Sequence, residues 1–111
     1  MTNELDTASA AAQETLERSA AELVHLQVVR ELRATHGLVY RALDGMEPPY
    51  LVAWDGRFVG EVHRHGPAYL HSWYVLPYGD DEEPTAKSPD FSGRPFGTAR
   101  AAAASLKPDQ A

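Results

Sequence analysis

The sequence predicts an α+β fold: a long N-terminal helix, a three- or four-stranded antiparallel β-meander, an acidic loop and a short C-terminal Ala-rich helix packed on the sheet. Three observations support this prediction. The segment from Ala8 to about His36 is rich in the helix formers Ala, Leu, Glu and Arg. Four short β-rich runs follow, separated by glycine and proline. A second helical run, Ala99 to Leu106, lies near the end of the chain.

Length and composition limit the classes of protein that fit. A chain of 111 residues can build one modest core, so a single domain over 10–107 is expected, with flexible ends at 1–9 and 108–111. The absence of cysteine excludes disulfides, thiolate nucleophiles and cysteine-based metal sites. Without a secretory signal or a membrane-length apolar run, a cytoplasmic location is expected. The Ala, Arg and Pro content fits a GC-rich bacterial or phage source.

The first helix carries two apolar stripes on nearly opposite sides. At about 100° per residue, Leu16, Ala20 and Leu23 share a side with Ala12, whereas the later stripe contains Val28, Val29 and Leu32. A helix that serves only its own sheet needs one stripe. The earlier stripe therefore predicts a partner, most simply a homodimer interface through Leu16, Ala20 and Leu23. The alternative is an Ala-rich overhang without a partner.

The β-rich runs are predicted as strands over Leu38–Leu43, Tyr50–Trp54, Arg57–His65 and Ala68–Leu76. Asp55–Gly56 is typical of a type I′ hairpin turn, because both of its central positions need a positive φ. Gly66–Pro67 is compatible with a type II′ turn, although a longer loop is also allowed there.

These two turns predict which side chains share a face of the sheet, because opposed residues of antiparallel strands point the same way. The expected core face contains Leu51, Ala53, Phe58, Gly60, Val62, His71, Trp73 and Val75. The reverse face contains Tyr50, Val52, Trp54, Arg57, Val59, Glu61, His63, His65, Leu70, Ser72 and Tyr74. Gly60 is expected opposite Trp73, where it leaves room for the indole ring.

The chain from 78 to 97 is acidic and rich in proline and glycine, which predicts either a functional loop or disorder. Its run Asp80–Glu83 is expected to be solvated. Thr98 is the predicted N-cap of the second helix, and Lys107 before Pro108 marks its end. That helix is expected to cover the core face beside the long helix.

No catalytic or cofactor motif is present in the chain. There is no Gly-x-Ser-x-Gly elbow, no His-Glu-x-x-His and no Gly-rich phosphate loop. Glu61, His63 and His65 could face one side of a strand, but three ligands in a row do not converge on one metal ion. The sequence therefore predicts neither an enzyme nor a metal or cofactor site.

The remaining candidate is a binding surface on the reverse face, which is rich in aromatic residues and arginine. Such side chains dominate protein interfaces. The predicted partner-binding residues are Tyr50, Trp54, Arg57, His63, His65 and Tyr74. They indicate a small non-catalytic regulatory or accessory protein that binds a protein partner. The alternative is a nucleic-acid-binding module, such as a DNA-reading accessory protein of a phage or mobile element, with contacts from Arg57 and Arg64. The net charge of −6 disfavours that alternative.

Overall fold

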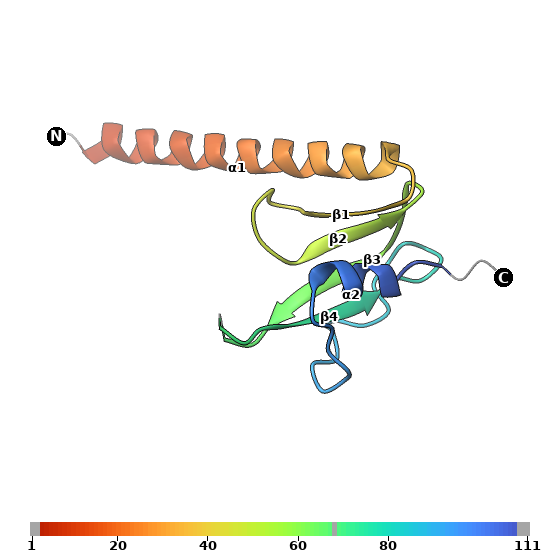
Figure 1. The fold of residues 1–111 in the computed structure, drawn as a ribbon. Helices are drawn as coiled ribbons and strands as arrows, with labels where there is room; N and C mark the ends of the chain where they lie inside the picture. The colour runs from red at the N-terminus through yellow and green to blue at the C-terminus, as the bar shows by residue number, and fades with distance from the viewer. Residues whose placement is uncertain (1–2, 68, 109–111) are drawn as a thin grey trace.

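The structure, a computed structural model, describes residues 3–67 and 69–108 and has the expected α+β architecture (Figure 1). The elements are α1 (Asn3–Ala34), β1 (Leu38–Ala42), β2 (Tyr50–Trp54), β3 (Arg57–His65), β4 (Ser72–Pro77) and α2 (Ala99–Ser105). The four strands form one antiparallel sheet in the order β1-β2-β3-β4. Helix α1 begins at Asn3 rather than at Ala8. Of the ends predicted to be flexible, 1–9 and 108–111, residues 1–2 and 109–111 lie outside the described residues, and 3–9 belong to α1.

The hairpin between β2 and β3 has the predicted turn. Asp55 has φ 49° and Gly56 has φ 82°, so both central positions are left-handed as a type I′ turn requires. Trp54 then pairs with Arg57, and Ala53 pairs with Phe58, both as expected. The local chemistry of an Asp-Gly pair is therefore sufficient to position this turn.

A β-bulge in β3 changes the register beyond that point. Val52 pairs with Gly60 and not with Val59, so β3 carries one residue that has no partner on β2. A bulge of this kind moves every following side chain to the other face of the sheet. The predicted division into a core face and a reverse face is therefore wrong beyond Val59.

The connection between β3 and β4 also differs from the expected tight turn. His65 pairs with Ser72, and a loop that begins at Gly66 joins the two strands. The backbone N–H of Leu70 donates to the carbonyl oxygen of Pro67 at 2.9 Å inside this loop. The type II′ turn is therefore wrong, and the longer loop is correct. Gly60 consequently lies opposite Pro77, and Trp73 lies opposite Arg64.

The two helices cover opposite faces of the sheet. Val28 and Leu32 of α1 pack against Leu51 and Ala53. Ala102 and Ala103 of α2 pack in a second cluster with Val52, Val62 and Trp73. Because Leu51 and Val52 are consecutive strand residues, the two clusters lie on the two sides of one sheet. The expectation that α2 lies beside α1 is wrong, since each helix covers its own face.

Helix α2 has the predicted N-cap and needs a glycine beneath its end. The hydroxyl oxygen of Thr98 accepts the backbone N–H of Ala101 at 3.1 Å. A Cβ on Gly60 would lie 2.7 Å from the carbonyl oxygen of Leu76 and 2.8 Å from a methyl group of Leu106. Gly60 therefore allows the close approach of the α2 end, and not the packing of Trp73 as expected.

The loop over 78–97 covers part of the β4 edge of the sheet. Trp73 and Phe96 exchange two backbone hydrogen bonds of 3.0 and 2.8 Å, and Tyr78 forms a β-bridge with Pro84. Thr85 also donates its backbone N–H to the carbonyl oxygen of Pro77 at 3.1 Å. The outer backbone of β4 is thus paired with the chain's own loop, which is one way in which proteins protect an edge strand.

The N-terminal part of α1 projects beyond the sheet, as Figure 1 shows. The molecule measures 68 × 34 × 22 Å, and its Cα radius of gyration is 17.8 Å. A compact chain of this length would have a radius of gyration of about 13 Å. The long helix therefore extends past the domain that it packs on.

Candidate binding surfaces

The residues predicted to bind a partner fall on two different faces. Tyr50 belongs to the cluster under α2 and stacks on Trp73 with 5.7 Å between ring centroids. Trp54 lies under the ammonium group of Lys107, whose Nζ is 4.4 Å from the centroid of the Trp54 ring. These half-buried rings therefore belong to the interior beneath α2 and its C-terminal end, and they do not form an open surface.

Of the other predicted partner-binding residues, His63, His65 and Tyr74 lie on the α1 face, beyond the part that α1 covers, whereas Arg57 pairs with Trp54 and shares its face. The ring of His65 stacks on Phe91 at 4.2 Å between centroids, and the edge of Tyr74 meets the same Phe91 at 5.2 Å. Phe91 comes from the loop and was not singled out by the sequence analysis, because nothing local links it to β3. The β-bulge separates this group from Tyr50 and Trp54.

Glu61, His63 and Tyr78 form a half-buried polar cluster beside these rings. The hydroxyl of Tyr78 donates to Oε2 of Glu61 at 2.6 Å, and Nε2 of His63 lies 3.2 Å from Oε1 of the same carboxylate. Burial, followed by the hydrogen bond to Glu61, raises the pKa of Tyr78 far above its usual range. Both carboxylate oxygens are therefore occupied by groups of the chain itself.

Glu61, His63 and His65 are the residues of β3 whose side chains are of types that can ligate a metal ion. In the part of the chain that the structure describes, no three His, Cys, Asp or Glu side chains converge on a common point. His65 instead uses its ring to stack on Phe91. The cluster around Glu61 is a polar network between β3 and the loop.

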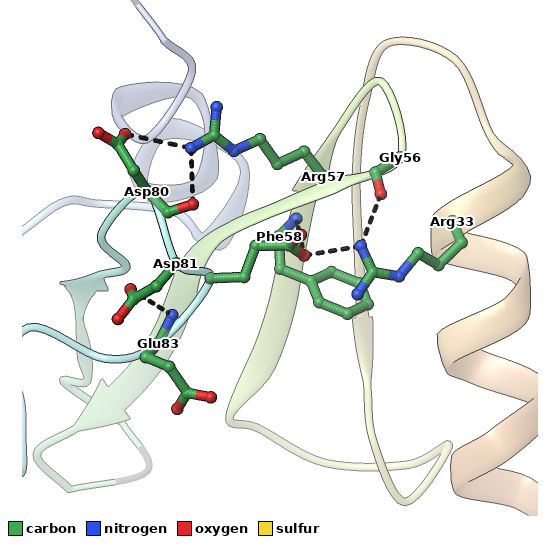
Figure 2. A network of polar contacts seen from close by, with 8 residues as sticks. Arg33, Gly56, Arg57, Phe58, Asp80, Asp81 and Glu83 are labelled. Atoms are coloured by element: carbon green, nitrogen blue, oxygen red, sulfur yellow. Dashed lines mark hydrogen bonds and ion pairs between the residues drawn. The ribbon is translucent and has the colours of Figure 1, made fainter.

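Asp80, Asp81 and Glu83 of the acidic run are exposed, as expected, but Glu82 is partly buried, and Asp80 and Glu82 each pair with an arginine of the chain (Figure 2). Nη1 of Arg33 lies 2.7 Å from Oε2 of Glu82 and also donates to the carbonyl oxygen of Gly56 at 3.2 Å. The same Glu82 oxygen accepts the backbone N–H of Phe58 at 3.2 Å. One carboxylate thus joins the end of α1, the β2–β3 hairpin and the loop.

The ionisation of Glu82 reflects these contacts. Burial opposes the charged form, but the Phe58 amide and the Arg33 guanidinium outweigh that effect and hold the pKa of the Glu82 carboxyl below its usual value. The guanidinium of Arg33 also lies over the Phe58 ring, 4.0 Å from its centroid. The sequence alone does not predict that Arg33 pairs with Glu82, because 49 positions separate them.

The two arginines predicted to contact nucleic acid lie near opposite ends of β3. Nη2 of Arg57 pairs with Oδ1 of Asp80 at 3.1 Å. Arg64 is exposed and lies seven residues further along the strand, a separation of about 23 Å. Asp80 partly neutralises the first arginine, and the distance prevents the two from acting on one phosphate.

Leu16 lies on the projecting part of α1, whereas Ala20 lines a hollow with Leu43 and Asp44 of the domain. Leu16 is 70% exposed and Leu23 is 61% exposed, and Ala20 between them is also exposed. Leu23 precedes the buried Leu32 by nine residues, which at about 100° per residue places it on the opposite side of the helix. The structure thus leaves this stripe uncovered by the described part of the chain.

The β1 edge of the sheet is the second uncovered feature. A groove of about 580 Å³ runs along it, and its wall residues come from α1, β1, the following loop and β2. They are Val28, Leu38, Val39, Tyr40, Arg41, Ala42, Gly45, Met46 and Tyr50. This site was not predicted, because an open edge depends on what the rest of the chain covers.

Comparison of the chain with models of known protein families, with curated proteins and with solved structures gave no match. Within the described residues, no helix is both long enough and apolar enough to cross a membrane. The exposed stripe of α1 and the β1 edge are therefore the two candidate binding surfaces of the described residues.

Proposed function

We propose that the protein is a non-catalytic binding module that acts as a homodimer joined through the projecting part of α1. The carrying observation is the exposed leucine stripe, formed by Leu16, Leu23 and Leu26, on the side of α1 that faces away from the sheet. Leu26 is 51% exposed. An apolar stripe on a projecting helix is typical of a surface that another helix covers.

A second copy of this chain fits the stripe in the antiparallel direction. A two-fold axis between Ser19 and Ala20 brings Leu16 of one copy against Leu23 of the other, and the reverse contact follows from the symmetry. The two small residues at the axis let the helices approach closely. The charged side chains of this part of the helix lie more than a quarter turn from Leu16 and Leu23: Glu14, Glu17, Arg18 and Glu22. Glu22 lies one turn from Leu26, about 40° around the helix, so charges are kept away from the central Leu16–Leu23 contact only.

The free energy of this contact predicts a reversible dimer. Complete burial of a leucine side chain is worth about 1.5–3 kcal/mol, whereas association costs about 4–15 kcal/mol in lost freedom of motion. The dimer buries four leucines, two from each copy. The free energy gained by their burial is therefore similar in size to the free energy that association costs. The dimer should therefore dissociate on dilution.

The kinds of side chain that are exposed favour protein binding over the nucleic-acid alternative. The exposed apolar surface supports a protein contact, whereas Arg57 is already paired with Asp80 and Arg64 stands apart from it. Arg33 is likewise paired with Glu82 of the chain's own loop. No described feature favours a phosphate-binding surface.

The test is the solution mass over a range of protein concentrations, measured by light scattering at low and moderate salt. The wild-type chain should approach twice its chain mass as concentration rises, with little dependence on salt. Leu16→Glu combined with Leu23→Glu should remain monomeric, because a carboxylate would replace each central apolar contact. The matched control, Arg18→Glu, lowers the net charge by the same two units on the other side of the helix and should still dimerise.

Two outcomes would overturn the proposal. A wild-type chain that stays monomeric at all concentrations would remove the dimer. A monomer that gains mass only with a mixed-sequence DNA duplex at low salt, and loses that gain in Arg57→Glu with Arg64→Glu, would favour the nucleic-acid-binding module.

A further inference from the structure

We propose that the free edge of β1 binds an extended segment of a partner protein, which adds a fifth strand to the sheet. This site goes beyond the dimer contact, since it uses a different element and a different kind of partner. The segment that fits is apolar in its centre and basic at its ends.

The two edges of the sheet differ in whether other parts of the chain pair with them. The outer edge of β4 is paired with the chain's own loop through Phe96 and Thr85. At the other edge, no strand of the described chain lies beside the outer side of β1, which is a strand of five residues. Unpaired strand edges readily accept another strand, and several peptide-binding domains use such an edge as their site.

The hydrogen-bond pattern identifies the backbone groups that are available. The N–H of Asp55 donates to the carbonyl oxygen of Gly37 at 3.0 Å, so the residues at alternate positions after Gly37 face β2. Leu38 and Tyr40 therefore direct their N–H and C=O groups away from β2. The carbonyl oxygen of Ala42 has the same direction, and it accepts the N–H of Gly45 at 3.0 Å, which confirms this alternation. Leu38 and Tyr40 thus offer four backbone groups to an added strand.

The side chains around this edge favour an apolar central segment. On the α2 face, a row of aromatic contacts crosses the sheet and ends at Tyr40. Trp73 lies 5.7 Å from Tyr50, and Tyr50 lies 5.6 Å from Tyr40, between ring centroids. On the α1 face, Val28 and Val39 line the groove. A strand beside β1 would alternate its side chains between these two apolar walls.

The charges at the two ends of β1 favour basic residues at the ends of the segment. Asp44 and Glu47 are exposed just after β1, and Asp55 lies beside the start of β1, where its Oδ1 accepts the N–H of Gly37 at 2.7 Å. Arg41 lies within the strand, but Glu31 neutralises it through an ion pair of 3.2 Å. The ends of the edge are therefore more acidic than its centre.

The experiment uses a defined probe, an end-capped peptide that alternates valine and threonine between terminal lysines. Binding to the full chain is followed by NMR shifts of the amides, together with hydrogen exchange at Leu38 and Tyr40. Both amides should exchange more slowly when the peptide is present. A peptide that shifts no β1 amide at millimolar concentration would overturn the proposal.

Two N-methylated forms of the probe separate strand addition from general apolar contact. One form is methylated at every second amide, and the other is methylated at the intervening amides. Only one set of amides can face β1, so one form should lose affinity by about tenfold or more while the other keeps it. Equal binding of the two forms would overturn the proposal.

A charge variant tests the preference for basic ends. Glu47→Lys should weaken binding of the lysine-ended probe by about two- to fivefold. Glu14→Lys makes the same change of charge on the projecting part of α1 and should leave binding unchanged. Equal weakening in both variants would show that only net charge matters, and it would overturn this part of the proposal.

The test also distinguishes a second copy as the occupant of β1. If Leu38 and Tyr40 are already protected in the free protein, and the Leu16→Glu, Leu23→Glu variant stays dimeric, then β1 joins two copies and the partner segment is overturned. If the probe fails while the leucine variant dissociates, the edge proposal fails and the dimer proposal remains.

Discussion

Arg33 in the last turn of α1 and Glu82 in the acidic loop form an ion pair of 2.7 Å, which joins two segments that lie far apart in the chain. The contact is more than a pair of surface charges. The Arg33 guanidinium also donates to the carbonyl oxygen of Gly56, and the Glu82 carboxylate also accepts the N–H of Phe58 (Figure 2). The position of the loop relative to the hairpin therefore depends on these two residues.

Glu82→Gln should destabilise the fold by about 1 kcal/mol, because the ion pair is partly exposed and its charges are screened by water. The change keeps the size of the side chain but removes its charge. Arg33→Gln should cost a similar amount, and the double variant should cost less than the sum of the two. Chemical unfolding of all four proteins provides the coupling energy. Strict additivity would show that the pair contributes nothing to stability.

The stability that Glu82 contributes should depend on pH. The folded pKa of this carboxyl lies below its ordinary value of 4.5, so its contribution is present above that value and is lost as the pH falls through the folded pKa. The difference in unfolding free energy between wild type and Glu82→Gln should thus be largest near neutral pH and shrink below pH 4.5. Asp44 and Asp90, whose pKa values are also lowered, are present in both proteins and cancel. A difference that is independent of pH would contradict this assignment.

The sequence alone correctly predicted those features of the fold that depend only on residues close together in the chain. The bounds of β2 and β3, the turn at Asp55–Gly56 and the N-cap at Thr98 all follow from residues within a few positions of one another. Each of these features depends on a backbone preference or on one short hydrogen bond. Such preferences act in the same way before and after the chain is folded.

The predicted assignment of side chains to the two faces of the sheet was wrong, because one extra residue in β3 reverses the alternation of side chains between the faces. The bulge at Val59 moves His63 to the face opposite Trp54, although both were assigned to one face. The bulge is favoured by packing, since Val59 and Gly60 both meet the α2 side of the core. That packing involves Leu106, which lies far along the chain, so no local pattern at β3 could have indicated it. The open β1 edge escaped prediction for the same reason.

Gly60→Ala should be strongly destabilising. The new Cβ would lie 2.7 Å from the carbonyl oxygen of Leu76, and backbone atoms at that distance cannot move independently of the sheet. Overpacking of this kind costs about 1–3 kcal/mol. Gly97→Ala is the matched control, because nothing lies within 4 Å of a Cβ at Gly97. Thermal unfolding should show a large loss for the first variant and little change for the second; equal melting temperatures would contradict the close approach of α2.

Trp54→Ala should destabilise the domain by about 2–3 kcal/mol, which is less than the loss for a fully buried tryptophan. The indole is half-buried and lies beneath Lys107, so its removal exposes the sheet at the end of α2. The projecting part of α1 is distant from this position. Light scattering should therefore show the same dimer as in wild type, while chemical unfolding shows the lost stability. A variant of unchanged stability would mean that Trp54 is free to bind a partner, as the sequence had predicted.

Tyr78 should be the last of the five tyrosines to ionise. Its hydroxyl is half-buried and donates to Oε2 of Glu61, and both effects raise the pKa of the phenol above its ordinary value of 10.0. A group with a raised folded pKa contributes stability that is present below the unfolded pKa and is lost as the pH rises toward the folded pKa.

An alkaline titration of phenolate absorbance should show one late step that Tyr78→Phe removes. The wild-type protein should also lose stability above pH 10 more steeply than Tyr78→Phe, whereas at neutral pH the variant should be weaker by about 1 kcal/mol because a half-buried hydrogen bond is missing. Simultaneous titration of all five tyrosines would show that the contact with Glu61 does not persist in solution.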